Sequence, residues 1–199
     1  MKQHKIYVDT IKPIVDRVGA AFLLVIFSWL LLLILLIYAL LFRWPPFFVQ
    51  DRLGKNGNPF RMIKFRTLKN TGASLQQRRF IWGDFLRFTS LDELPQLVNI
   101  LKGEMSFVGP RPLPVEYASA FSDEQKIRHN IKPGLTGWAQ VNGRHSISWE
   151  QKFKHDLYYV GHVSFWFDIK ITVKTMLLIL SFHKDTSLKE SIFTGNDNE

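Results

Sequence analysis

The longest apolar stretch of the chain runs from Ala20 to Phe42 and carries no charged side chain. As a helix it is long enough to cross a hydrocarbon core of roughly 30 Å. Pro45-Pro46 ends the stretch, and no small-residue cleavage site of a signal peptide follows it. Ahead of it, residues 1–19 interleave apolar and charged side chains, which is typical of an amphipathic helix beside a membrane. We therefore predict that residues 1–46 form a membrane-associated N-terminal unit.

Basic residues flank this stretch on both sides. Lysines and arginines occupy positions 2, 5, 12 and 17 before it and positions 43, 52 and 55 after it. A helix that spans a bilayer usually shows a Lys/Arg bias toward one side. The symmetric flanks fit a re-entrant helix or a hydrophobic hairpin with both ends in the cytoplasm. An ordinary single span is the alternative on these residues alone.

After Pro46 the pattern changes to two extended runs. Phe47–Gln50 and Phe60–Thr67 flank a turn-rich segment, residues 54–58, and together they predict a β-hairpin. Because side chains alternate along a strand, Lys64 and Arg66 share one face of the second run. Such a pair forms either a solvated surface or part of an anion site, and the spacing alone favours the solvated surface.

A helical periodicity follows the hairpin. Trp82–Phe88 is predicted to be a short helix, and a second helix begins near Asp92, because Pro95 is tolerated only in a first turn. Lys102 and Gly103 are typical of the end of this second helix. Its apolar residues recur at helical spacing, which predicts one buried face made of Leu94, Leu97, Val98 and Leu101.

Less regular segments complete the chain. Residues 68–80 and 131–146 are predicted to be loops, the first of them flexible, and residues 115–130 are predicted to be helical. Ile169–Phe182 is a strongly apolar last helix, either packed inside or lying at a lipid interface. The predicted fold class is α+β and mostly helical. It has an N-terminal membrane helix, a β-hairpin and a compact helical domain with interfacial amphipathic helices, over residues 47–182. The tail, residues 183–199, is polar and is expected to be loosely held.

Composition narrows the chemistry. The chain of 199 residues has no cysteine, which excludes disulfides, thiolate metal sites and cysteine nucleophiles. Its formal net charge of +9 favours nucleic acid, anionic lipid headgroups or phosphorylated substrates as partners. The apolar stretch favours lipid and phosphate, so no nucleic-acid partner is expected. The histidines at positions 129, 145, 155 and 162 lack the spacing of a zinc site, and we assign no metal to them.

The pair Asp92-Glu93 stands at the start of a predicted helix, where backbone N–H groups and the helix dipole favour negative charge. One interpretation is structural, because Ser90 and Glu93 have the spacing of a capping box. The other interpretation is catalytic, with one carboxylate acting as a nucleophile toward a phosphoryl group. The neighbouring acid would then hold Mg²⁺, a hard cation that prefers oxygen ligands and bridges phosphates.

Two further segments are candidates for anion binding. Arg87 lies shortly before the acidic pair, and Arg111 stands between two prolines that fix the backbone and so aim its guanidinium. Arginine matches phosphate oxygens in a bidentate manner, and a surface salt bridge is the plainer alternative. Residues 133–144 fit either a ligand-contacting loop or a well-packed structural loop. They combine glycines with Trp138, Gln140, Asn142 and Arg144.

Together these motifs resemble the small monotopic polyprenol-phosphate phosphoglycosyl transferases of the bacterial sugar transferase family. The resemblance covers nearly the whole chain. Its matching segments are residues 50–54, 64–67, 90–96, 99–112, 132–144 and 156–159. Within the family, three segments are most similar to the diacetylbacillosamine-phosphate transferase of bacterial N-glycosylation. These segments are residues 116–117, 124–129 and 147–153.

The resemblance implies transfer of a sugar 1-phosphate from a UDP-sugar, expected to be an N-acetylated amino sugar, to undecaprenyl phosphate with release of UMP. It also implies Mg²⁺ as cofactor and a covalent phosphosugar intermediate on Asp92, with Glu93 assisting in Mg²⁺ binding and acceptor deprotonation. Positions that match phosphate- or nucleotide-contacting residues of the family are Lys64, Arg87, Arg111 and Arg144. Gln140 and Asp168 are two further substrate-binding candidates.

The implied location is the bacterial inner membrane, with the catalytic domain in the cytoplasm and the N-terminal helix re-entrant. The family usually breaks this helix with a Ser-Pro pair, whereas this chain has Ser28-Trp29. A serine can still bend a helix by bonding back to a carbonyl. The linker 68–80 also lacks the acidic residues that the resemblance leads us to expect. Rival interpretations are a plain hexose donor and a non-catalytic, lipid-binding membrane scaffold, and a homodimer is left open.

Overall fold

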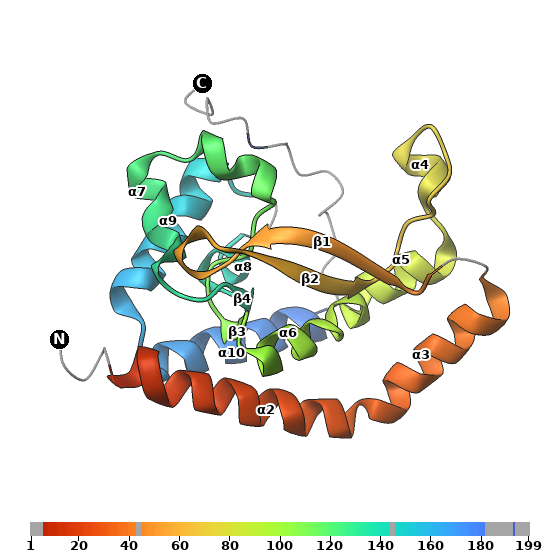
Figure 1. The fold of residues 1–199 in the computed structure, drawn as a ribbon, viewed down its shortest axis with the longest axis horizontal. Coiled ribbons are helices and arrows are strands. Elements are labelled where there is room, and N and C mark those ends of the chain that lie inside the picture. The colour runs from red at the N-terminus through yellow and green to blue at the C-terminus, as the bar shows by residue number, and fades with distance from the viewer. Residues whose placement is uncertain (1–5, 43–44, 144–145, 182–192, 194–199) are drawn as a thin grey trace.

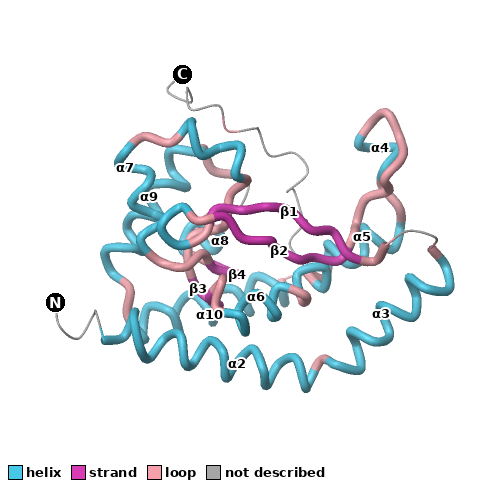
Figure 2. Tube along the Cα trace, in the orientation of Figure 1, coloured by secondary structure: helices cyan, strands magenta, loops and turns pink. Residues whose placement is uncertain are grey.

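The computed structural model describes residues 6–42, 45–143, 146–181 and 193. It is mostly helical with two small two-stranded sheets, which confirms the predicted α+β class. Figure 1 shows a long bent helix pair, α2 and α3, along the lower edge of the molecule, with the hairpin β1–β2 and shorter helices above it. Figure 2 shows the strands surrounded by helices and loops. The N-terminal segment is therefore one edge of the helical body.

The N-terminal apolar segment forms two helices joined by a sharp bend. A π-helical turn, η1 (Tyr7–Ile11), leads into α2 (Lys12–Ile26), and α3 (Ser28–Leu41) continues after a bend of 60°. At the bend the Ser28 hydroxyl donates a hydrogen bond to the Val25 carbonyl at 2.8 Å, as expected for a serine that bends a helix without proline. No single helix among the described residues has the length and apolar composition to cross a bilayer, whereas this bent pair has both.

The N-terminal turn of the bent pair lies beside the tip of the hairpin. Asp9, near the start of the pair, is 3.7 Å from Lys55, in the hairpin turn that follows it. The same N-terminal turn is fastened to the body, because Tyr7 and Lys12 hydrogen-bond Asp168 at 2.7 and 2.5 Å. The two ends of the pair lie on opposite sides of the molecule, and the hairpin that follows runs back toward its start (Figure 1). The bend fits either a broken span or a re-entrant helix.

The predicted hairpin is confirmed, with a longer first strand. β1 (Phe47–Leu53) pairs antiparallel with β2 (Pro59–Phe65), and a 3₁₀ turn, η2 (Lys55–Gly57), connects them. The predicted flexible loop 68–80 contains one regular element, α4 (Leu75–Arg78). Ser74 begins it with a capping box, which the sequence analysis did not predict.

Helix α5 (Ile81–Phe88) and helix α6 (Gln96–Lys102) confirm the two predicted helices after the hairpin, but the predicted start of the second near Asp92 is wrong, because α6 begins at Gln96. Gly103 ends α6 in the left-handed conformation, with φ 82°, which glycine adopts without steric cost. The predicted buried face of α6 is wrong at Leu101, which is 41% exposed. The buried residues are instead Gln96, Leu97, Asn99 and Ile100.

The face of α6 is shifted because the helix packs against both α2 and β2. Asn99 makes the contact with β2 by bonding its backbone. It accepts a hydrogen bond from the Ile63 N–H at 3.2 Å and donates one to the Arg61 carbonyl at 2.8 Å. A buried amide that satisfies strand backbone groups is thus part of the core, which apolar periodicity does not detect.

A second, parallel sheet was not predicted. β3 (Ser106–Val108) pairs with β4 (Gly134–Thr136), and α8 (Trp138–Val141) follows, so the predicted loop 131–146 is wrong over these residues. The strands cross so closely that a Cβ on Gly134 would lie 2.1 Å from the Gly109 nitrogen. Gly134 and Gly109 therefore permit this close backbone packing, which supports the structural alternative for this segment.

The C-terminal half is built from short helices and two longer ones. The predicted helical region 115–130 is divided into η4 (Val115–Ala120), α7 (Asp123–Lys126) and η5 (Ile127–Asn130). α9 (Trp149–His162) was not predicted, and α10 (Phe165–Leu180) begins four residues before the predicted Ile169. Ser164 accounts for this earlier start, because its hydroxyl accepts a hydrogen bond from the Phe167 N–H at 3.3 Å.

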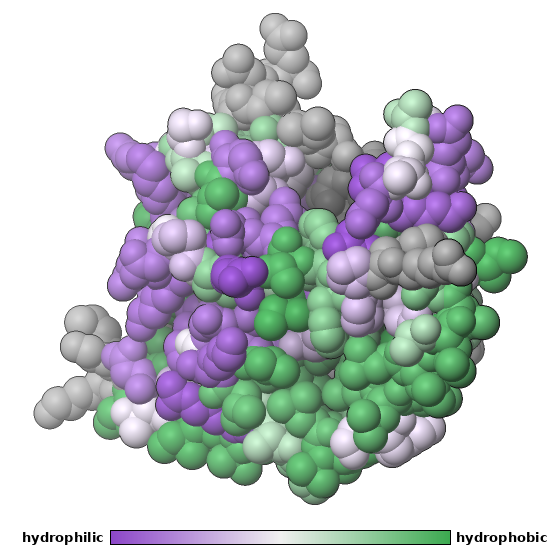
Figure 3. All heavy atoms as spheres, turned by 45° about the vertical axis from the view of Figure 1, so that its right-hand side comes forward, coloured by the Kyte–Doolittle hydropathy of each residue, from purple (hydrophilic) through white to green (hydrophobic). Residues whose placement is uncertain are grey.

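Apolar side chains cover the outer faces of the bent pair, α2 and α3, and of α10. Figure 3 shows hydrophobic residues gathered over the lower part of the molecule, where α2 and α3 run. The exposed apolar residues of α10 are Phe165, Trp166, Ile169, Val173, Met176, Leu177, Ile179 and Leu180. This outward face matches the interfacial alternative for the last helix better than the packed one.

The tail departs from its prediction at one residue. Phe193 is 4% exposed and packs in an aromatic cluster with Phe121, Trp149 and Phe153, with ring centroids 5.1 to 5.5 Å from its own. The expectation of a loosely held tail is therefore wrong at this position. The burial of Phe193 could not be predicted, because one apolar residue in a polar segment produces no periodic pattern.

Candidate functional site

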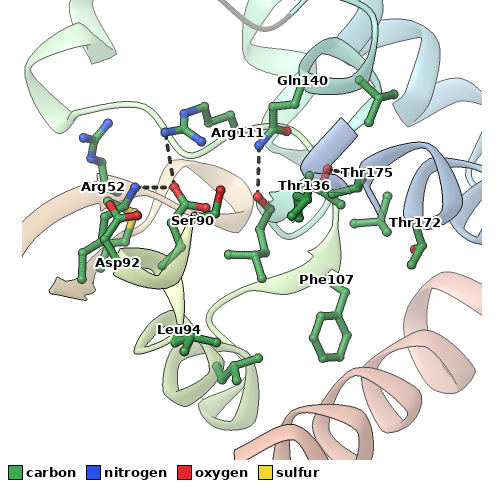
Figure 4. A pocket seen from close by; sticks show the side chains of 18 of the residues that line it. Arg52, Ser90, Asp92, Leu94, Phe107, Arg111, Thr136, Gln140, Thr172 and Thr175 are labelled. Atoms are coloured by element: carbon green, nitrogen blue, oxygen red, sulfur yellow. Dashed lines mark hydrogen bonds and ion pairs between the residues drawn. The ribbon is translucent and has the colours of Figure 1, made fainter. Parts of the chain in front are cut away.

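A cavity of about 1160 Å³ lies among the hairpin, a 3₁₀ turn called η3 (Leu91–Glu93), and helices α2 and α10. Charged side chains line one part of it, and apolar side chains of α2 and α10 line another. Figure 4 shows Ser90 and Asp92 on one side of the cavity, Thr136 and Thr175 on the other, and Arg111 between them. The cavity therefore has two parts. We call the part lined by Lys64, Asp92, Glu93 and Arg111 the charged chamber, and the part lined by Phe22, Leu23, Met176 and Ile179 the apolar groove.

The acidic pair belongs to η3, between α5 and α6. Ser90 begins this turn in the left-handed conformation, with φ 59°, and its side chain makes no capping hydrogen bond. The capping-box interpretation is therefore wrong. Backbone strain of this kind is characteristic of functional sites. The turn places Asp92, 7% exposed, in the wall of the cavity.

Glu93 bridges two cations from different parts of the chain. Its Oε1 lies 2.5 Å from the Lys64 Nζ of β2 and 3.6 Å from an Arg111 Nη. The Lys64 side chain is only 15% exposed, so the solvated-surface interpretation is wrong for this lysine. Arg66 instead donates to the Phe47 carbonyl at 3.0 Å and holds the hairpin. The structure thus gathers Lys64, Arg111 and both acids in the charged chamber.

Arg87 and Gln140 also line the cavity. Arg87, on α5, donates to the Thr67 carbonyl at 3.0 Å. Gln140, on α8, donates from its amide to the Leu135 carbonyl at 3.1 Å. The Gln140 Oε1 atom is buried and accepts no hydrogen bond from the described residues. Arg144, the remaining cationic candidate, lies outside the described residues.

Asp168, the third acidic candidate, hydrogen-bonds residues other than Lys64 and Arg111. Its carboxylate accepts hydrogen bonds from Tyr7 at 2.7 Å, from Lys12 at 2.5 Å and from Tyr159 at 2.6 Å. Trp138 likewise packs on neighbouring elements, 5.0 Å from the Phe167 ring and with Lys174 over its face at 4.6 Å. Asp168 and Trp138 therefore hold neighbouring elements of the protein together around the cavity.

A buried ion pair behind Arg111 was not singled out from the sequence. Arg128, on η5, donates to the Asp156 Oδ2 from Nε at 3.0 Å and from Nη2 at 2.6 Å. The same Nη2 donates to the Arg111 carbonyl at 2.8 Å. Asp156 begins one of the matching segments, residues 156–159, which was the available signal. Arg128 lies in another segment of the resemblance, residues 124–129, but nothing in the sequence pairs it with an acid 28 residues away.

Burial shapes the ionisation of this region. Burial raises the pKa of the Asp156 carboxyl, and the adjacent Arg128 guanidinium acts in the opposite direction. Burial and Arg128 together lower the pKa of His129 to about 4. His129 is therefore neutral near pH 7 and adds no second cation beside Arg128.

The site offers a cation few protein ligands. Among the described residues there is no group of three or more His, Cys, Asp or Glu that could hold a metal ion. Asp92 and Glu93 nevertheless supply adjacent carboxylate oxygens in the same cavity. That donor set fits Mg²⁺, which is usually held by one or two carboxylates together with waters and substrate phosphates.

Comparisons of the sequence with known proteins match the chain to a family. The model of the bacterial sugar transferases matches residues 7–182. The sugar transferase EpsL of Bacillus subtilis is 40% identical over 195 residues, which cover 94% of this chain and 96% of EpsL.

Longer relatives carry more specific names. The UDP-glucose:undecaprenyl-phosphate glucose-1-phosphate transferase of Escherichia coli is 40% identical over 177 residues, 81% of this chain and 38% of the relative. The UDP-N-acetylgalactosamine-undecaprenyl-phosphate N-acetylgalactosaminephosphotransferase of Aeromonas hydrophila is 35% identical over 185 residues, 86% of this chain and 44% of the relative. The chain thus spans less than half of these two proteins. The family match over residues 7–182 shows that the chain belongs to the bacterial sugar transferase family.

Proposed function

We propose that the protein transfers a sugar 1-phosphate from a UDP-sugar to undecaprenyl phosphate and releases UMP. The observation that carries this proposal is the charged chamber, where Asp92 and Glu93 face Lys64 and Arg111. Cations around two acids fit a site for a pyrophosphate-bearing donor. The names of the Escherichia coli and Aeromonas hydrophila relatives support the same reaction class.

The proposed reaction has two displacements at one phosphorus atom. A carboxylate oxygen of Asp92 attacks the donor phosphorus that bears the sugar, and the bond from this phosphorus to the bridging oxygen breaks. UMP leaves with that oxygen. A phosphate oxygen of undecaprenyl phosphate then attacks the same phosphorus and frees the Asp92 carboxylate. Lys64, Arg87 and Arg111 stabilise the phosphate charge during both steps.

Mg²⁺ is the proposed cofactor, held by Asp92 and Glu93 with substrate phosphates and water. When bound, it would neutralise pyrophosphate charge and make UMP a better leaving group. Glu93 is also proposed to assist deprotonation of the acceptor. Its ion pairs with Lys64 and Arg111 keep this carboxylate at the edge of the chamber, directly beside Asp92.

The acceptor lipid explains the second part of the cavity. Apolar side chains of α2 and α10 line it, among them Phe22, Leu23, Met176 and Ile179. We propose that the polyprenyl chain lies there while its phosphate reaches Asp92. The outer faces of α2, α3 and α10 are then embedded in the bacterial inner membrane, with the catalytic body in the cytoplasm.

An N-acetylated amino sugar is the proposed donor sugar. Gln140 lines the cavity, and its amide oxygen, which accepts no hydrogen bond from the described residues, can accept one from an acetamido N–H after a side-chain rotation. The Aeromonas hydrophila relative is named for an N-acetylated sugar. A plain hexose donor is the second candidate, because the Escherichia coli relative is named for glucose.

Replacement of the nucleophile tests the mechanism. We expect Asp92→Asn to lower UMP release from UDP-sugar and undecaprenyl phosphate by about 10³-fold or more, since an amide is a poor nucleophile. Asp51→Asn changes an exposed acid of β1 in the same way and should retain wild-type activity. Wild-type turnover by Asp92→Asn would exclude the covalent route. Absence of turnover from the wild-type protein with every donor would favour the non-catalytic scaffold.

Metal removal tests the cofactor. We expect EDTA to lower UMP release by about 10²-fold or more, because the leaving pyrophosphate oxygen loses its neutralising cation. Added Mg²⁺ should restore the rate, and added Na⁺ at the same ionic strength should not. Full turnover in EDTA after thorough dialysis would contradict the proposal.

A donor panel tests the sugar. UDP-N-acetylglucosamine, UDP-N-acetylgalactosamine, UDP-diacetylbacillosamine, UDP-glucose and UDP-galactose are compared by UMP release with undecaprenyl phosphate and Mg²⁺. We expect an N-acetylated sugar to have a kcat/KM at least about tenfold above either hexose, because the site loses a hydrogen bond with a plain hexose. Gln140→Leu should reduce the ratio of kcat/KM for the N-acetylated donor to kcat/KM for the hexose donor. Preference for UDP-glucose or UDP-galactose would establish the hexose candidate instead.

Cysteine labelling tests the topology. The chain has no cysteine, so single variants report one position each. Thr10→Cys and Asn58→Cys are exposed positions on either side of the membrane pair. We expect an impermeant maleimide to label both from the cytoplasmic side only, because a re-entrant pair returns to the side it entered. Trp29→Cys, at the bend, should be protected from both sides, and labelling of the two flanks from opposite sides would show a single span.

A further inference from the structure

The backbone of the Pro-Arg-Pro segment is held at consecutive carbonyls. Each carbonyl from position 110 to position 113 accepts a hydrogen bond from another element, at 2.8 to 3.1 Å. The donors, in chain order of the acceptors, are the Gly134 N–H, the Arg128 guanidinium, the Arg52 guanidinium and the Leu53 N–H. The bond at the Arg111 carbonyl therefore comes from a charged side chain and not from a strand.

Arg128 is itself fixed by its surroundings. Its side chain is 3% exposed, and that of Asp156 is 4% exposed. The guanidinium lies over the Phe153 ring at 5.6 Å. Because a buried guanidinium without its carboxylate is costly, Arg128 is confined to the geometry that Asp156 dictates. Its Nη2, shared between Asp156 and the Arg111 carbonyl, then points in one direction.

The Arg111 side chain lacks a comparable restraint of its own. It is 36% exposed, and its 3.6 Å separation from Glu93 Oε1 is too long for a hydrogen bond. Its aim into the chamber is therefore set mainly by its backbone. A misplacement of about 1 Å at a catalytic group can cost about 10²-fold in rate.

We propose that Arg128, clamped by Asp156, is a positioning residue that aims Arg111 at the donor phosphates. This inference rests on the proposed function for the role of Arg111 toward phosphate. Arg128 is among the residues that line the cavity, but its guanidinium is engaged by Asp156 and by the Arg111 carbonyl, so its proposed action is through Arg111. The rival explanation is that the ion pair only stabilises the fold.

The test removes the pair without leaving a buried charge. Replacement of a buried ion pair by apolar residues of similar size is often neutral for stability or stabilising. We expect the double variant Arg128→Met with Asp156→Leu to melt within a few degrees of the wild type, while its kcat/KM for the donor falls about 10²-fold. The matched control is Lys154→Gln with Glu150→Gln, an exposed ion pair of α9 at 2.6 Å, which should retain full activity.

A second background distinguishes positioning from stability. In an Arg111→Ala protein, the same double change should lower kcat/KM by less than about threefold, because there is no guanidinium left to aim. An equal fold loss in both backgrounds, or wild-type activity of the double variant, overturns the proposal. The single variant Arg128→Lys should be intermediate, since an ammonium lacks the fork that reaches both acceptors.

Hydrogen exchange makes the outcome independent of turnover. Loss of the clamp should speed exchange at the backbone amides of Gly109, Arg111 and Leu113 in the double variant and not in the control pair. If the double variant exchanges faster but the wild-type protein itself releases no UMP, the clamp is supported and the proposed function is rejected. Unchanged exchange rejects the clamp whatever the activity.

Discussion

The carboxylate of Asp168 holds the bent helix pair onto the rest of the molecule. Lys12 and Tyr7 reach it from the N-terminal helix and Tyr159 from α9, so one buried charge joins three elements. Hydrogen bonds to a charged group contribute about 1.5–3 kcal/mol each. Burial and the Asp168 charge raise the pKa of Tyr159 well above its usual value, so this hydroxyl stays a donor at neutral pH. Because α2 is fixed here, the charged chamber and the apolar groove form one cavity.

Glu93 joins separate segments inside the charged chamber, as Asp168 does outside it. It ties β2 to the Pro-Arg-Pro segment through Lys64 and Arg111, and it does so one residue from the proposed nucleophile. Nearby cations favour the ionised form of a carboxylate, which both nucleophilic attack and metal binding require. An interior that is charged on one side and apolar on the other suits a reaction between a water-soluble nucleotide sugar and a lipid.

The sequence predicted those features that depend on residues close together in the chain. Pro95, Gly103 and the turn at 54–58 placed α6 and the hairpin, and the proline-flanked Arg111 marked the chamber. Contacts between distant segments were out of reach. The parallel pair β3–β4 depends on the close crossing of Gly109 and Gly134, and Arg128 acquires its role only through Asp156 and the Arg111 carbonyl. Lys64 looked solvated because its partner acid lies 29 residues away.

The bend without proline follows from the same principle. The Ser28 hydroxyl bond to Val25 is a local aid worth about 1 kcal/mol. The larger constraint is packing on both arms. Ala20 of α2 is buried against Leu97 and Ile100 of α6, whereas Ile34 and Tyr38 of α3 are buried against Phe65 of the hairpin and Leu86 of α5. A straight helix would expose one of these arms, at about 25 cal/mol for each Å² of apolar surface. Tertiary packing therefore sets the bend, and it does so without the Ser-Pro pair that the resemblance led us to expect.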